Sequence, residues 1–359
     1  MWSSAACVTA LLGGYTGMEP RKTFQELEDT PNTSYPKSLY PESLEQYIDE
    51  VSERAARLYK FLIVPRGATP ETLWHYTSTK AFFEILETNT IHLGDAAYMN
   101  DPTEGIIFHE DLQEAVDLIG HEDIKALGPK KDPVYDFISD PGFRMRLMHS
   151  FVDRFFILSL SEDNNSLDQW RIYGDDARGV AIGFDSGLLQ SHWASVHRAD
   201  LLKITYDRKQ RHELIGEVTQ LYVQYKDSAH ALFGNSPPRG LMTALGHLRG
   251  EIFALLDKFR YAIKHEGYRS EVEWRLCVHV RTDPMRPQQF LYLARRNTVS
   301  EVLSINGGHF KQGFLPISQL AWGPLHNKVP SERFVASYAG RYGPIGMSQS
   351  DLPYRGKAS

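Results

Sequence analysis

Apolar side chains recur at helical spacing in the stretch PESLEQYIDEVSERAARLYKFLIV. The positions that share one face are Leu44, Tyr47, Ile48, Val51, Ala55 and Leu58. A stripe of this kind is typical of an amphipathic helix that buries one side. We therefore predict an N-terminal helix over residues 39–66, which ends at the proline and glycine residues of PRGATP.

Shorter segments with strand or helix character follow. TKAFFEIL (79–86) places its apolar residues on one helical face after Thr and Ser caps, and SLDQWRIYG (166–174) predicts a short helix. Residues with strand composition flank these helices. The predicted strands are 72–78 (TLWHYTS), 90–94 (TIHLG), 154–163 (RFFILSLSED) and 179–185 (GVAIGFD).

The clearest period of two in the chain lies in SEVEWRLCVHV (270–280). On one face the pattern places Val272, Trp274, Leu276 and Val278, and on the other Glu271, Glu273, Arg275 and Cys277. Because side chains alternate between the faces of a strand, we expect one apolar face and one polar face here.

The order of the elements favours an α+β fold. Strands and helices interleave irregularly, and no GxGxxG or P-loop sequence follows a strand, so a doubly wound parallel sheet is a poor match. Residues 207–265 are mostly helical, with a break at GNSPPRG. We predict one domain over residues 67–355, with a mixed, largely antiparallel sheet core, helical decorations and a helical layer inserted at about 207–265.

Composition and charge narrow the class of protein. The 359 residues are 42% hydrophobic and carry a net charge of -6, so the chain can bury a core but has no global basic field for nucleic acid. Its two cysteines, Cys7 and Cys277, offer no disulfide framework and no metal-ligand spacing. No apolar run is long enough to cross a bilayer. We expect a cytoplasmic protein without a membrane partner, whose residues 1–38 form a leader that is disordered or peripheral to the fold.

The octapeptide YMNDPTEG (98–105) combines two interpretations. Asp101 is a preferred N-cap, Pro102 suits the first helical position, and Glu104 can bond back to the cap, so the local pattern indicates a helix start. Asn100, Asp101 and Glu104 are also candidates for a ligand site, because helix amino termini present free N–H groups.

Aromatic and histidine residues supply further candidates. His75 stands in the first predicted strand beside the hydroxyl of Tyr76, so it is either a partly buried histidine bonded to the backbone or a ligand-facing residue. Trp170 and Tyr173 are three residues apart and share a helical face. They are either core residues or a stacking surface for a flat ring.

The acidic face of 270–280 also has two interpretations. Glu271, Glu273 and Arg275 are either a solvent face with an ion pair or the floor of an active site, since two close carboxylates raise one pKa and provide an acid and a base. A carboxylate cage for Mg²⁺ from Asp101, Glu104, Glu271 and Glu273 is an alternative. No His or Cys pair has the spacing of a zinc site, and we predict no metal.

Five motifs, in order along residues 72–355, resemble those of the bacterial family called domain of unknown function 2971, many of whose members are thought to lie in phage-defence neighbourhoods. The motifs are LWHYTSTKAFFEILETNTIHLGDAAYMNDPTEG, SLSEDNNSLDQWRIYGDDARGVAIGFD, YRSEVEWRL, AWGP and SDLPYR. The stretch 207–265 carries none of them.

The order His, Tyr, Glu along the chain is similar, more distantly, to that of ADP-ribosyltransferases. This resemblance implies that His75 holds the adenosine-side ribose of NAD, that Tyr173 stacks on nicotinamide, and that Glu273 bonds the nicotinamide ribose, with Glu271 as its competitor. It further implies NAD as a substrate and a macromolecular acceptor, protein or nucleic acid, in phage defence or as a toxin. The likeness to the domain of unknown function 2971 family suggests that Asn100, Asp101 and Glu104 border the pocket. We also expect Tyr76, Trp170 and Arg275 in the binding site.

Two other classes of function compete with this interpretation. One is a metal-dependent nuclease or hydrolase that uses the four carboxylates and loses its activity with EDTA. The other is a module that senses a nucleotide-like ligand without turnover.

Overall fold

The structure is a computed structural model. It describes residues 42–63, 69–98, 107–108, 110–111, 114, 153–197, 199–234, 238–281, 291–295, 298–310, 312–326, 333 and 345–354. The chain divides into two compact units, Met1–Tyr47 and Ile48–Ser359. Described residues of the first unit form the start of a helix. The sheet and the candidate site lie wholly in the second unit.

The elements agree closely with the predicted segments. The described α-helices are α2 (Glu42–Ile63), α3 (Thr79–Thr88), α7 (Leu167–Ile172), α8 (Ser186–His197), α9 (Arg208–Phe233) and α10 (Pro238–Arg260). The described 3-10 helices are η3 (Ala96–Tyr98), η4 (Glu266–Glu271) and η5 (Gly307–His309). The described strands are β1 (Thr72–Thr77), β2 (Thr90–Asp95), β3 (Asp153–Ser161), β4 (Val180–Asp185), β5 (Ala199–Lys203), β6 (Glu273–Arg281), β7 (Leu291–Arg295), β8 (Thr298–Asn306), β9 (Ile317–Trp322) and β10 (Gly346–Gln349).

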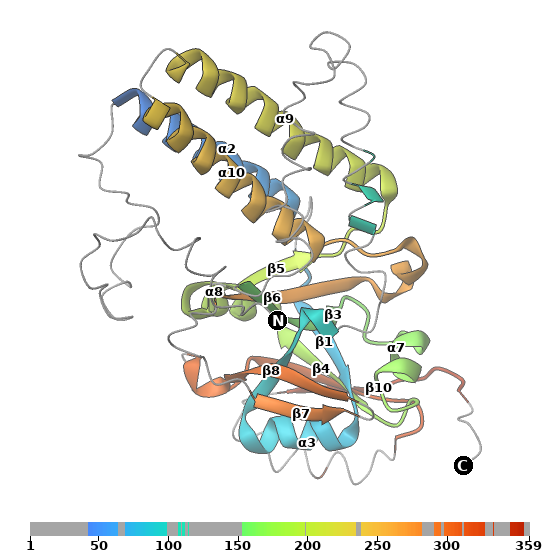
Figure 1. The fold of residues 1–359 in the computed structure, drawn as a ribbon. Coiled ribbons are helices and arrows are strands. Elements are labelled where there is room, and N and C mark those ends of the chain that lie inside the picture. The colour runs from blue at the N-terminus through green and yellow to red at the C-terminus, as the bar shows by residue number, and fades with distance from the viewer. Residues whose placement is uncertain are drawn as a thin grey trace, which may run out of the picture. The chain divides into compact units, whose positions relative to one another are not determined.

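The strands form one ten-stranded sheet (Figure 1). Its main path runs β10-β9-β4-β1-β3-β2-β8-β7, while β6 pairs with β3, and β5 pairs with β6. The described strand pairings are antiparallel except that of β9 with β10. The predicted α+β fold with a mixed, largely antiparallel sheet is therefore confirmed, and α9 and α10 form its helical insertion.

Strand β3 is the branch point of the sheet. Along one edge it pairs with β6 over its full length, from Asp153–Arg281 to Ser161–Glu273. Its other edge is shared, because β2 pairs with residues 156 and 157, whereas β1 meets β3 only at the pair Trp74–Ser161. Strand β1 instead pairs with β4 along its whole length. Among the described strands, residues 158–160 of β3 thus have no ladder partner on this edge, and the sheet splits between β1 and β3.

The two faces of β1 belong to two different apolar clusters. Leu73 packs in the main cluster with Phe82 of α3, while the neighbouring Trp74 packs in a smaller cluster with Trp170 of α7. Side chains alternate along a strand, so a single strand supplies both clusters. Burial of one such side chain contributes about 1.5–3 kcal/mol, and burial on both faces therefore fixes β1 firmly.

The helical insertion is closed at its root by main-chain hydrogen bonds. Helices α9 and α10 run alongside each other (Figure 1). At their base, Thr205 N donates to Ala262 O at 2.8 Å, and Lys264 N donates to Thr205 O at 3.3 Å. This closure places Tyr206 and Lys264, which are far apart in sequence, beside the start of β6.

No helix among the described residues is both long enough and apolar enough to span a bilayer.

Candidate functional site

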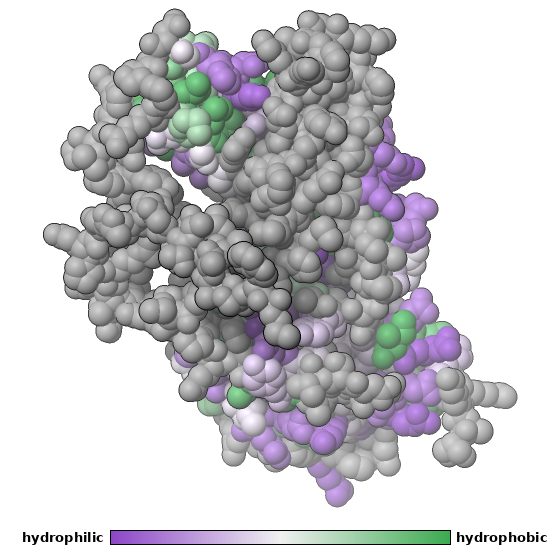
Figure 2. Space-filling view, in the orientation of Figure 1, coloured by the Kyte–Doolittle hydropathy of each residue, from purple (hydrophilic) through white to green (hydrophobic). Residues whose placement is uncertain are grey.

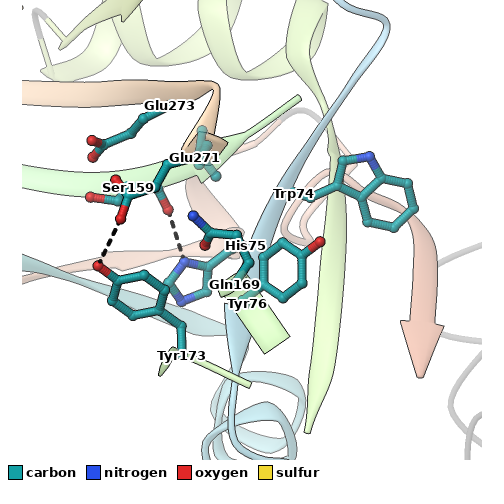
Figure 3. A pocket seen from close by; sticks show the side chains of 9 residues that line it. Trp74, His75, Tyr76, Ser159, Gln169, Tyr173, Glu271 and Glu273 are labelled. Atoms are coloured by element: carbon teal, nitrogen blue, oxygen red, sulfur yellow. Dashed lines mark hydrogen bonds between the residues drawn. The ribbon is translucent and has the colours of Figure 1, made fainter. Parts of the chain in front are cut away.

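A small cavity lies at the split between β1 and β3 (Figure 3). Its volume is about 50 Å³, which is room for a few water molecules or one small group. Of the residues predicted for the site, the cavity wall includes His75, Tyr76, Tyr173, Glu271 and Glu273. Together with Ser159 and Leu160 of β3, they bring five separate segments to the cavity: β1, β3, the end of α7, the end of η4 and the start of β6.

The imidazole of His75 fills part of the split. Its Nδ1 lies 3.1 Å from the main-chain oxygen of Ser159, in the part of β3 that has no ladder partner on this edge (Figure 3). A carbonyl oxygen only accepts, so Nδ1 carries a proton. The hydrogen bond to the backbone holds the ring in a fixed orientation.

Tyr76 presents its ring to the cavity but uses its hydroxyl elsewhere. The hydroxyl donates to Asp163 O at 2.7 Å and accepts from Ser166 N at 3.2 Å. Burial is the largest influence on this hydroxyl and raises its pKa above the ordinary value for tyrosine. Tyr76 therefore anchors the loop between β3 and α7, and its aromatic ring is the part available to a ligand.

Trp170 belongs to the core and not to the cavity wall. Its side chain is 0% exposed and packs edge-on against Tyr76, with ring centroids 4.7 Å apart. Its position agrees with the first of the two interpretations, a core residue, and the structure does not place it in the cavity wall. Of the two aromatic residues predicted to share a helical face, only Tyr173 lines the cavity.

Tyr173 is the C-cap residue of α7 and points toward an acid. Its hydroxyl donates to Glu271 Oε1 at 3.4 Å (Figure 3). Burial raises the pKa of Tyr173 to about 12, and the negative charge of Glu271 adds to this effect. The hydroxyl therefore remains a hydrogen-bond donor at neutral pH.

Glu271 and Glu273, which we call the acid pair, share one buried cation. Lys264 Nζ lies 2.5 Å from Glu271 Oε2 and 3.1 Å from Glu273 Oε2. The three side chains are at most 6% exposed, so solvent screens their charges little. Lys264 is thus the ion that allows two carboxylates to occupy one buried site.

Arg275 holds Glu273 from the other side. Its Nε and Nη2 donate to the two carboxylate oxygens of Glu273 at 3.0 and 3.2 Å, and its Nη1 donates to Tyr261 O at 3.1 Å. Arg275 is 0% exposed and does not line the cavity. In this structure Arg275 therefore positions Glu273, and its predicted contact with a ligand stays a prediction.

The two members of the acid pair differ in their affinity for a proton. Burial opposes ionisation of Glu273, but Arg275 and Lys264 outweigh burial and hold the pKa of Glu273 below its ordinary value. Burial also acts on Glu271, where Lys264 offsets it only in part, so the pKa of Glu271 is raised. Lys264 stays charged, because the attraction of both acids exceeds its own burial cost and raises its pKa. Glu271 is therefore the member suited to exchanging a proton.

The backbone between the two acids differs from the predicted alternation. Strand β6 begins at Glu273, Glu271 ends the 3-10 helix η4, and Val272 between them is left-handed, with φ 39° and ψ 50°. A β-branched residue rarely adopts this conformation. The prediction that Glu271 and Val272 are strand residues was wrong, and the left-handed turn is what presents both acids to Lys264.

Three predicted residues, Asn100, Asp101 and Glu104, lie outside the described residues, as does the predicted helix start in YMNDPTEG. Within the described part of the chain, no group of three or more His, Cys, Asp and Glu residues could hold a metal ion. The two described members of the proposed carboxylate cage are instead bridged by Lys264.

Sequence reasoning missed several residues of the site. Lys264 and Tyr206 are brought in by the closed root of the insertion, where the Tyr206 hydroxyl accepts a 2.9 Å hydrogen bond from Glu273 N. Ser159 hydrogen-bonds the Glu273 carboxylate, and Gln169 lines the cavity. The one usable signal was that two neighbouring buried acids require a cation.

Comparison with known proteins gives one match, over part of the chain. No curated protein and no solved structure matches the chain significantly. The match spans α7 to the start of β6, including the insertion that the sequence motifs left out, and contains Tyr173, Lys264 and the acid pair. Residues 169–276 thus match the model of a family described as "Protein of unknown function (DUF2971)".

Proposed function

We propose that the protein is an ADP-ribosyltransferase-like enzyme that cleaves NAD between nicotinamide and ribose. The observation that carries this proposal is the convergence of His75, Tyr173 and the acid pair on one cavity. These are the residue types that the resemblance to ADP-ribosyltransferases assigns to NAD. In this proposal the reacting end of NAD enters the cavity, which has to widen beyond its present volume of about 50 Å³.

The chemistry requires a carboxylate at the reacting carbon. As the C1′–N bond breaks, its electron pair leaves with nicotinamide, which becomes neutral, and positive charge develops on the ribose. Ionised Glu273 supplies a fixed negative charge near this centre, held in place by Arg275. The acceptor then forms a bond to C1′ and gives its proton to a base.

We assign the base role to Glu271. Its pKa is raised by burial, and a base with a raised pKa accepts a proton more readily. The 3.4 Å hydrogen bond from Tyr173 keeps its Oε1 directed at the cavity wall. This assignment makes Glu271 the proton acceptor and Glu273 the electrostatic stabiliser.

His75 and Tyr173 position the substrate in this proposal. The Nδ1 bond to Ser159 O fixes the orientation of the His75 ring, which contacts a ribose hydroxyl in this proposal. The ring of Tyr173, which is half-buried, stacks on nicotinamide. The acceptor is a macromolecule, protein or nucleic acid, and the setting is the cytoplasm, in phage defence or as a toxin.

Two assays test the proposal. Purified protein is incubated with adenine-labelled NAD and bacterial cell extract, and both label transfer and nicotinamide release are measured, with Glu271→Gln as the inactive control. The expected result is transfer that survives EDTA. Activity abolished by EDTA supports a metal-dependent hydrolase instead, and NAD binding without product supports a sensing module. Failure of release and transfer in every extract overturns the proposal.

A further inference from the structure

Several polar side chains of the cavity are already engaged with protein groups that the structure describes. His75 bonds Ser159 O, the Ser159 hydroxyl bonds Glu273, and Tyr173 bonds Glu271. The side-chain amide of Gln169 makes no hydrogen bond to any residue that the structure describes. Gln169 as a whole residue is 8% exposed.

The amide of Gln169 opens onto the cavity, since its atoms are not among the fully buried side-chain atoms that lack a partner. Without a described protein partner, its two donors and its acceptor remain available to a ligand. Gln169 lines the cavity, and Figure 3 shows its amide among the side chains of the pocket. The arrangement is therefore expected where a ligand supplies the missing partners.

The main chain holds Gln169 in place from both sides. Its N–H donates to Ser166 Oγ at 3.4 Å, and its carbonyl accepts from Tyr173 N at 2.9 Å and from Gly174 N at 3.1 Å. The amide therefore starts from a fixed backbone position, and a ligand that bonds it does not have to order a loop.

We propose that Gln169 recognises the primary carboxamide of a flat aromatic ligand. A primary carboxamide is the group that pairs with an amide through two parallel N–H···O bonds, one in each direction. The rings of Tyr76 and Tyr173 line the same cavity and provide apolar walls for the attached ring. The inference rests on the proposed function, because nicotinamide is an aromatic ring with a primary carboxamide.

The test measures binding, and no turnover is needed. Benzamide and acetophenone have similar shapes, but acetophenone lacks the two N–H donors. We expect wild-type full-length protein to bind benzamide roughly tenfold more tightly than acetophenone in calorimetry or ligand-observed NMR, which is the usual magnitude for one hydrogen bond to a buried group. Gln169→Met keeps the length of the side chain and is expected to bind both compounds equally.

Two further variants complete the design. Gln220→Met changes an exposed glutamine on α9 and is expected to keep the wild-type preference. Gln169→Glu keeps the shape and an acceptor, and is expected to weaken benzamide binding if the methionine variant fails to fold. Equal binding of the two compounds by wild type, binding of neither, or a preference that survives in both Gln169 variants overturns the inference.

The outcome is distinguishable from that of the proposed function. Benzamide selectivity without nicotinamide release from NAD leaves this inference standing and removes the transferase proposal. Nicotinamide release without benzamide selectivity does the reverse. In an active protein, Gln169→Met is expected to raise KM for NAD. The variant should also no longer discriminate against 3-acetylpyridine adenine dinucleotide, which lacks the same two donors.

Discussion

Lys264 Nζ lies 2.5 Å from Glu271 Oε2, in a place where both side chains are almost completely buried. This contact crosses from the root of the helical insertion to the end of η4 and continues to Glu273 at 3.1 Å. One ammonium group thus links the insertion to the two acids of the candidate site.

Removal of this cation is expected to destabilise the fold strongly. Lys264→Met leaves two buried carboxylates with a single remaining cation, Arg275, and breaking a buried ion pair from one side costs about 3–5 kcal/mol. Urea unfolding measures the effect. The control is Lys209→Met on α9, where the paired lysine is 85% exposed and the expected change is below about 0.5 kcal/mol. Equal stabilities of the two variants would contradict the role given to Lys264.

The two acids are expected to respond differently to amide substitution. Glu271→Gln removes the proposed base, so transfer of ADP-ribose to the acceptor should fall by about 10²–10⁴-fold while NAD still binds. Glu273→Gln should lower turnover as well, because it removes the charge proposed to stabilise the ribose cation. It should also cost about 3 kcal/mol of stability, because Arg275 is 0% exposed and loses its charged partner. Turnover, NAD affinity and unfolding are measured for each variant. A catalytic loss confined to Glu273→Gln would reverse the two assignments.

Stability is expected to depend on pH through the same two residues, with opposite signs. Arg275 and Lys264 hold the pKa of Glu273 below its ordinary value despite burial, so its stabilisation is present above the unfolded pKa of about 4.3 and is lost as pH falls through the folded pKa. Burial raises the pKa of Glu271, so its contribution is present below the unfolded pKa and is lost as pH rises through the folded one.

Unfolding free energies measured from about pH 3 to pH 7 separate these effects. Glu273→Gln should lose less stability in acid than wild type, and Glu271→Gln should lose less as pH rises. Identical pH profiles for wild type and both variants would mean that neither carboxyl has the environment described.

At the left-handed residue between the acids, a glycine variant is expected to be more stable than an alanine variant, which is the reverse of the usual order. Glycine normally destabilises a helix or strand relative to alanine, by about 0.5–1 kcal/mol. At Val272, with φ 39°, alanine retains a conformational cost of about 1–2 kcal/mol that glycine avoids. Val272→Gly is therefore expected to be more stable than Val272→Ala in thermal unfolding. The opposite order would mean that the turn is not left-handed in solution.

Local patterns predicted most of the described elements, because helices and strands with one buried face show their period in the sequence. The same approach failed at Glu271 and Val272, since alternating polar and apolar letters do not reveal a single left-handed residue that ends a 3-10 helix. Trp170 was ambiguous for a related reason, because a helix of six residues has too few positions to show which side faces the core.

The site depended on contacts that no local pattern contains. His75, Tyr173 and Glu273 were grouped through their order along the chain, and the cavity brings them together. Lys264 carries no local signal, since its position follows from the pairing of Thr205 with Ile263 across the insertion. The partnerless amide of Gln169 is visible only once the bonds of its neighbours are known.

Because only one register pair joins β1 to β3, the sheet consists of two parts that are weakly connected. The part with β1, β4, β9 and β10 meets the part with β3 at the pair Trp74–Ser161. Side-chain hydrogen bonds add to this contact, from His75 to Ser159 and from Tyr76 to the loop after β3. Separation of the two parts breaks few main-chain hydrogen bonds and leaves the other described strand pairings intact. A ligand larger than the present cavity is therefore admitted at the lowest free-energy cost by separation of β1 from β3. Among the central strands, amide hydrogen exchange should be fastest at this junction.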